Sequence, residues 1–74
     1  MNPYLKLAIA MLGGTNEAAQ KLGVSRYSIY QWSQSIPLKR ALQIEEMTGG
    51  QVLASQLKPE FFNELNRTIN GPAA

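Results

Sequence analysis

The segment TNEAAQKLGVSRYSIYQW, residues 15–32, constrains the fold more than any other part of the chain. Its first half places Ala18, Ala19 and Leu22 at the spacing of the buried stripe of an amphipathic helix. Gly23 follows directly, and glycine commonly ends a helix because it adopts a left-handed backbone without the steric cost of a Cβ atom. The segment therefore predicts a short helix that ends in a tight turn.

The residues after this turn predict a second short helix. Ser25 is a good N-cap residue because its hydroxyl oxygen can accept a backbone N–H at the start of the helix. Val24 and Ile29 stand at the two positions of a hydrophobic staple across that cap. Ile29 and Trp32 are three residues apart and give the helix an inward face. We therefore expect Trp32 to be a core residue rather than a platform on which bases stack.

The outward face of this second helix has the composition of a DNA-reading surface. Arginine, glutamine, serine and tyrosine form hydrogen bonds to base edges and phosphates, whereas a helix needed only for packing usually exposes Glu, Lys and Ala. No acidic residue lies between Glu17 and Glu45, so nothing in this part of the chain repels a phosphate backbone. The candidate base contacts are Ser25, Arg26, Tyr27, Tyr30 and Gln31.

The two helices together resemble the helix-turn-helix of phage Cro and repressor proteins and of the related YdaS-type antitoxins. The resemblance covers about residues 3–60 and rests on Ala19, Gly23, a β-branched residue at 24, Ile29, Trp32 and the later run IP…RA…IE…TGG. It implies an all-α, compact bundle of about five short helices of the lambda-repressor-like type, with the helix-turn-helix at helices 2 and 3. It also implies that positions 26, 27 and 31 carry base contacts.

Each candidate base-contacting residue has an expected partner on the DNA. Arg26 is expected to read a guanine through O6 and N7, with a solvated side chain or a phosphate contact as the alternative. Gln31 is suited to adenine or a neighbouring base, and Tyr27 to a thymine methyl group or a phosphate.

Helical periodicity also organises the rest of the chain. Asn2 and Pro3 open a first helix whose buried stripe is Leu5, Ala8, Ile9 and Leu12, and Thr15 is expected to cap the next helix. Pro37 starts a helix with Leu38, Ala41, Leu42 and Ile44 on or near its buried side, plus Met47. Residues 51–57 fit a short helix or a strand, and the helix is favoured. Pro59 opens a last helix with Phe61, Leu65 and Ile69 in register, so residues 1–70 form one domain and 71–74 a frayed tail.

Composition narrows the functional classes. The chain has 74 residues with no cysteine and no histidine, so disulfides, the usual zinc sites and conventional nucleophile–base pairs are excluded, and no enzyme, metal or cofactor is expected. Residues 1–40 hold five basic residues and one acidic residue, whereas residues 41–74 hold two basic and four acidic residues. The basic half contains the helix-turn-helix, as an electrostatic footprint on DNA requires.

Phosphate contacts are expected around the reading helix. The free N–H groups at a helix N-terminus bind anions, which favours Thr15 and Asn16, although both residues also fit a purely structural capping role. Lys21, Lys39 and Arg40 are the basic candidates, with solvated surface charge as the competing interpretation.

These features predict a sequence-specific transcriptional repressor that reads the major groove of a double-stranded DNA operator with the helix at about residues 25–34. The resemblance implies a Cro-like repressor of a phage or prophage. We expect a homodimer on DNA, with Phe61, Phe62 and Leu65 as a candidate dimer face, and a cytoplasmic location without membrane or small-molecule partners. Two alternatives stay open: a DNA-binding antitoxin, and a helical protein–protein interaction module whose helix-turn-helix is only scaffold.

Overall fold

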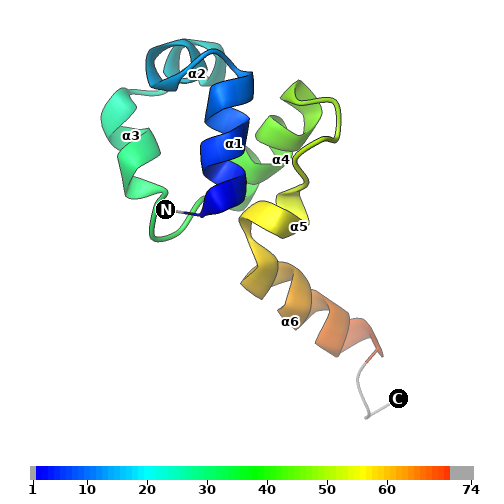
Figure 1. Ribbon diagram of the computed structural model, residues 1–74. Coiled ribbons are helices and arrows are strands. Elements are labelled where there is room, and N and C mark those ends of the chain that lie inside the picture. Colours follow the sequence, from blue (N-terminus) through cyan, green and yellow to red (C-terminus); the bar gives the residue numbers. More distant parts are fainter. Residues whose placement is uncertain (1, 71–74) are drawn as a thin grey trace.

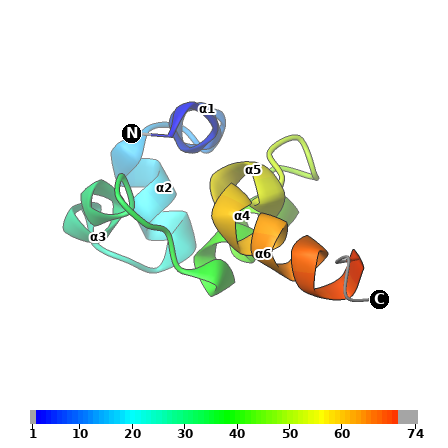
Figure 2. The same cartoon turned by 90° about the horizontal axis from the view of Figure 1, so that it is seen from below.

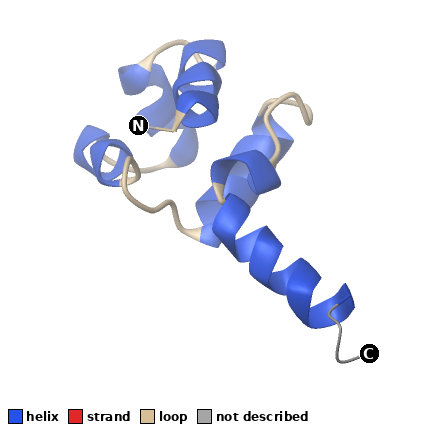
Figure 3. Cartoon of the chain, turned by 60° about the horizontal axis from the view of Figure 1, so that its bottom comes forward, coloured by secondary structure: helices blue, strands red, loops and turns tan. Residues whose placement is uncertain are grey.

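The computed structural model describes residues 2–70, with side chains described up to residue 64, and within that range it is all-helical (Figure 1). The helices are α1 (Pro3–Met11), α2 (Thr15–Leu22), α3 (Arg26–Gln31), α4 (Leu38–Met47), α5 (Ala54–Leu57) and α6 (Pro59–Asn70). Loops and turns join these helices, and no strand occurs in the described part (Figure 3). The predicted all-α fold is confirmed, and residues 51–57 contain a short helix rather than a strand. The expected tail at 71–74 lies outside the described residues.

Helix α1 begins as the sequence predicts. Asn2 is its N-cap, and the side-chain Oδ1 atom accepts a hydrogen bond from the backbone N–H of Tyr4 at 2.7 Å. The Nδ2 atom of the same side chain donates to the carbonyl of Gln56 at 3.0 Å. Asn2 therefore both caps α1 and holds it against α5, far along the chain.

The start of α2 differs from the prediction. Gly14 occupies the N-cap position with φ of 102°, and Thr15 is the first helical residue. No side chain caps this helix, so the prediction that Thr15 is the cap was wrong. The backbone of Gly14, in a region that L side chains rarely adopt, brings the chain into the helix one residue earlier than expected.

The turn between α2 and α3 forms as predicted. Gly23 has φ of 72° in the left-handed region, and the N–H of Val24 donates to the carbonyl of Ala19 at 3.0 Å. Ser25 then caps α3, since its Oγ atom accepts the N–H of Ser28 at 3.2 Å. Helix α3 ends at Gln31 and continues as tight turns through Gln34, so it is shorter than the predicted 25–34.

The connection from α4 to α5 is built around a buried threonine. Thr48 follows α4, and its Oγ1 atom accepts the N–H of Val52 at 3.2 Å and lies 3.2 Å from the carbonyl of Glu45. The Oε1 atom of Glu45 accepts the N–H of Ala54 at 2.8 Å, the first residue of α5. These bonds hold the Gly49-Gly50 turn and fix α5 against α4.

The core lies between the first five helices. Its buried residues include all four members of the predicted α1 stripe and Trp32, which is only 7% exposed, so its predicted core role is confirmed. Ala41 and Ile44 carry the buried face of α4. Leu42 is 47% exposed and Met47 is 36% exposed, so the prediction that placed these two residues on or near the buried side was wrong.

Helix α6 leaves the bundle. It packs against α5, and its C-terminal half extends away from the other helices (Figures 1 and 2). Figure 2 also shows α2 and α3 on one side of the molecule and α4, α5 and α6 on the other. The helix-turn-helix is thus left open on the side opposite α6.

Candidate nucleic-acid interface

Helix α3 presents a polar and aromatic face to solvent. Ser25, Arg26, Tyr27, Tyr30 and Gln31 are all exposed, and Tyr27 is the most open at 69%. Ile29 is fully buried on the opposite side and holds α3 in the core. The structure therefore brings the five predicted base-contacting residues together on one short helix and its cap.

Two of these side chains are paired with each other. The Nη2 atom of Arg26 donates a hydrogen bond to the hydroxyl of Tyr30 at 3.1 Å. The Cζ atom of Arg26 lies 5.9 Å from the centroid of the Tyr30 ring, within the range of a cation–π contact. Ser25 is also engaged, because its Oγ atom caps α3 and lies 3.2 Å from the hydroxyl oxygen of Ser28.

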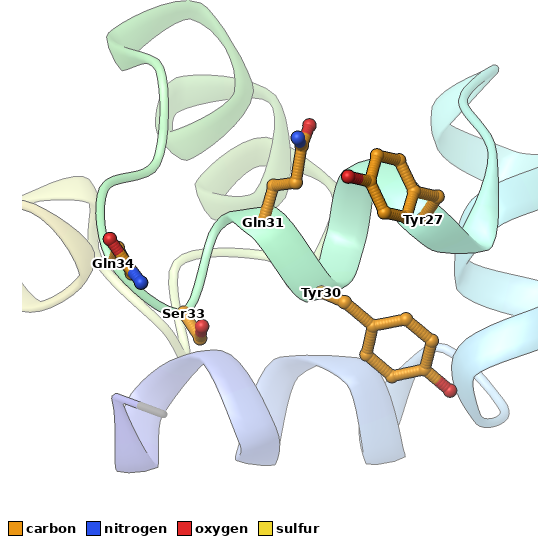
Figure 4. Close-up of a pocket in the computed structure, with 5 residues that line it drawn as sticks. All are labelled: Tyr27, Tyr30, Gln31, Ser33 and Gln34. Atoms are coloured by element: carbon orange, nitrogen blue, oxygen red, sulfur yellow. The ribbon is translucent and has the colours of Figure 1, made fainter.

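A shallow open pocket lies along the solvent side of α3 and the turn that follows it. Tyr27, Tyr30, Gln31, Ser33 and Gln34 line this pocket. Figure 4 shows Tyr27 and Gln31 pointing to one side of α3 and Tyr30 to the other, toward α1. Ser33 and Gln34 extend the polar surface past the end of the helix, and they were not among the predicted site residues although both are polar and follow it directly.

The N-terminus of α2 lies beside the turn that ends α1. Asn16 is exposed and Thr15 is partly buried, and no side chain caps the first turn of this helix. The N-terminal N–H groups of α2 and the positive end of its dipole are the features expected of a phosphate contact. Glu17 stands in the same first turn, where a negative charge is also favourable.

Three basic side chains donate hydrogen bonds to backbone carbonyls, two at the ends of helices and one in a loop. Lys21 Nζ donates to the carbonyl of Leu12, the C-cap residue of α1, at 3.0 Å. Arg40 Nη1 donates to the carbonyl of Leu22, the last residue of α2, at 2.9 Å. A positive charge is favourable at a helix C-terminus. The Lys21 contact therefore stabilises the packing of α2 against α1, and the Arg40 contact that of α4 against α2.

The third of these side chains was missed by sequence reasoning. Lys58 Nζ donates to the carbonyl of Ile36 at 2.8 Å, which ties the loop after α3 to the junction of α5 and α6. Its position between two helices gave no signal of this contact, because the partner lies 22 residues away in the sequence.

Lys39 and Arg40 differ in their surroundings although they are neighbours in α4. Arg40 is partly buried, and its Nη1 atom also donates to Gln43 Oε1 at 2.8 Å. Lys39 is exposed, and the structure records no hydrogen bond from its ammonium group to the described residues. Both line a second open hollow on the outer side of α4, together with Leu38, Leu42, Gln43 and Glu46.

The candidate dimer face begins where α6 leaves the bundle. Phe61 is 36% exposed, whereas Phe62 is partly buried and packs against the core. Their rings meet edge to face, with centroids 5.4 Å apart. Leu65 belongs to α6, but its side chain lies outside the described side chains.

Within residues 2–70, no helix is long and apolar enough to cross a membrane. The described residues also contain no group of three or more acidic side chains, histidines or cysteines that could hold a metal ion.

The fold and this surface define a helix-turn-helix domain. Residues 5–64 match the family model of the DNA-binding transcriptional regulator Cro, so the chain belongs to that family of DNA-binding regulators. It is also 39% identical over 62 residues to YdaS of Escherichia coli (strain K12), which is described as a candidate transcriptional regulator. That match covers 80% of this chain and 63% of YdaS, which is less than two thirds of the relative's length. No solved structure gives a significant match.

Proposed function

We propose that this protein is a sequence-specific transcriptional repressor that reads the major groove of duplex DNA with α3. The observation that carries the proposal is the exposed polar face of α3, placed by a helix-turn-helix in a chain of the Cro family. In such domains the N-terminal residues of the second helix contact base edges. Arg26 is at the first helical position, and Tyr27 and Gln31 lie on a neighbouring part of the exposed surface of α3.

The phosphate contacts in this proposal surround α3. The N-terminus of α2 at Thr15 and Asn16 binds one backbone, and Lys39 binds the flanking one from α4. Lys21 and Arg40 use only part of their donors inside the domain, since one nitrogen of each contacts a carbonyl. Their remaining N–H groups are available to phosphates. The basic first half of the chain supports this arrangement.

Dimerisation belongs to the same proposal. A single recognition helix of six residues covers few base pairs, so two copies on half-sites about 34 Å apart give the specificity of an operator. Helix α6 supports a dimer because it extends from the bundle, and an isolated helix of this length is marginal in water. Phe61 and Phe62 lie at its base, and the sequence continues the apolar stripe at Leu65. Repression then follows from occupation of a promoter in the cytoplasm of a bacterial cell.

An antitoxin that binds DNA is the alternative, although the 39% identical relative YdaS is described as a transcriptional regulator and does not favour it. It shares the α3 surface with the repressor and differs in having a protein partner. Co-purification of a co-encoded protein that binds this chain in a fixed ratio would favour the antitoxin.

The proposal is tested by fluorescence-anisotropy titration of a labelled duplex from upstream of the protein's own gene, beside a scrambled duplex, at two salt concentrations. We expect preference for the native duplex and weaker binding at higher salt. Arg26→Ala is expected to cost about 1–3 kcal/mol, concentrated at one base position.

The interaction-module alternative predicts a different pattern. In that case Arg26→Ala leaves activity unchanged, while Phe61→Ala or Phe62→Ala abolishes it. Absence of binding to any duplex at low salt would contradict the repressor proposal.

A further inference from the structure

The pair formed by Arg26 and Tyr30 has a geometry suited to orienting the arginine. The residues are four apart, which puts them on one face of α3 one turn apart. The hydrogen bond from Nη2 to the Tyr30 hydroxyl and the ring at 5.9 Å from Cζ hold the guanidinium at two points. An exposed arginine without such a partner samples many rotamers, so the pair restricts Arg26 before any ligand arrives.

Tyr30 leaves α3 on a different side from Tyr27 and Gln31. Figure 4 shows Tyr27 and Gln31 on one side of the helix and Tyr30 on the other, toward α1. Tyr30 is also less exposed than Tyr27, at 49% against 69%. Its place puts the Tyr30 hydroxyl within hydrogen-bond reach of Arg26, one turn earlier on the same face.

We infer that Tyr30 is a positioning residue that orients Arg26 for contact with a base. The inference rests on the proposed function, because it assigns Tyr30 a task within the DNA-reading surface. A bidentate contact to guanine needs the guanidinium plane aligned with the base edge. The Tyr30 hydroxyl takes one hydrogen of Nη2, and four of the five donor hydrogens of the guanidinium remain for the base.

Pre-alignment raises affinity because the side chain loses less freedom on binding. Immobilising one rotamer-rich side chain costs an amount that corresponds to roughly a two- to tenfold change in affinity. Tyr30→Phe keeps the ring and removes only the hydroxyl, so it isolates the hydrogen bond from Arg26. We expect this variant to bind the operator about three- to tenfold more weakly and to discriminate less at the guanine position.

A double-mutant cycle with Arg26→Gln tests the inference by fluorescence anisotropy on the preferred duplex. If Tyr30 acts through Arg26, Tyr30→Phe has no further effect in the Arg26→Gln background. If the two losses multiply, Tyr30 acts on DNA independently and the inference is overturned. Tyr27→Phe is the matched control, because the structure records no hydrogen bond from the Tyr27 hydroxyl to the described residues, and its effect is expected to be independent of Arg26.

A measurement without DNA separates this inference from the proposed function. The heteronuclear NOE of the Arg26 Nε–H group is expected to fall in Tyr30→Phe and to stay unchanged in Tyr27→Phe. An unchanged NOE in Tyr30→Phe overturns the inference even if the wild-type protein binds its operator specifically. If the NOE falls but no duplex is preferred by the wild-type protein, the proposed function fails while the orienting contact stands.

Discussion

Replacement of Arg40 by methionine should lower both the stability of the fold and the salt dependence of DNA binding. Arg40→Met keeps the aliphatic stem and removes the guanidinium, which donates to the Leu22 carbonyl at 2.9 Å and to Gln43 Oε1 at 2.8 Å. Hydrogen bonds from a charged group contribute about 1.5–3 kcal/mol each. Because Arg40 is partly exposed, water replaces part of this loss, and we expect a net cost of roughly 1–2 kcal/mol.

This cost is measurable as a shift of the thermal midpoint. In a domain of this size, 1 kcal/mol corresponds to roughly 4–8 °C, so Arg40→Met should unfold about 5–15 °C lower by circular dichroism. Lys39→Met is the matched control in the same helix. Because the Lys39 side chain is exposed, this substitution is expected to leave the midpoint nearly unchanged.

DNA binding completes the comparison. Each lost phosphate contact lowers the slope of log affinity against log salt by about 0.9, and both variants should show this change. An unchanged midpoint in Arg40→Met would contradict this prediction and show that the hydrogen bond to α2 contributes nothing to the stability of the fold. A fall in the midpoint with an unchanged salt slope would show that Arg40 stabilises the fold but does not contact a phosphate.

Two further predictions concern the turns that join the helices. Gly23→Ala should destabilise the domain by about 1–2 kcal/mol in urea unfolding, because φ at this position is 72°. The cost comes from the backbone conformation, since no atom lies within 4 Å of the added Cβ, and Gly23→Asn should therefore cost less. Equal stability of Gly23→Ala and the wild type would contradict this prediction. Thr48→Val should cost about 1–3 kcal/mol in the same assay, because the buried N–H of Val52 loses its acceptor. Thr48→Ser keeps the hydroxyl and should retain most of the stability, and unchanged stability of Thr48→Val would contradict the prediction.

The helices and the core were largely predictable because local signals agreed with the final packing. Gly23 marked the end of α2 and Ser25 the start of α3, and the spacing of Ile29 and Trp32 identified the buried face of α3. Periodicity failed for Leu42, since the rotation of α4 depends on what packs against it. The predicted N-cap of α2 was wrong because Gly14, with φ of 102°, lets the helix begin one residue earlier than expected.

The site was predictable as a surface and not as a set of contacts. Sequence spacing placed the polar residues of α3 together, but it did not reveal that Arg26 donates to Tyr30. It also left out the carbonyl partners of Lys21, Arg40 and Lys58, because these bonds join residues 9 to 22 positions apart. Long-range contacts of this kind depend on the tertiary arrangement, which no local pattern encodes.

The most direct test of DNA reading by α3 is selection of duplexes from a randomised library by the wild-type protein and by Arg26→Gln. We expect the wild type to enrich a defined half-site containing a guanine, and Arg26→Gln to lose the preference at that guanine while retaining the rest of the half-site. Failure of the wild-type protein to enrich any sequence, or the same half-site with the same guanine preference in both proteins, would contradict this expectation.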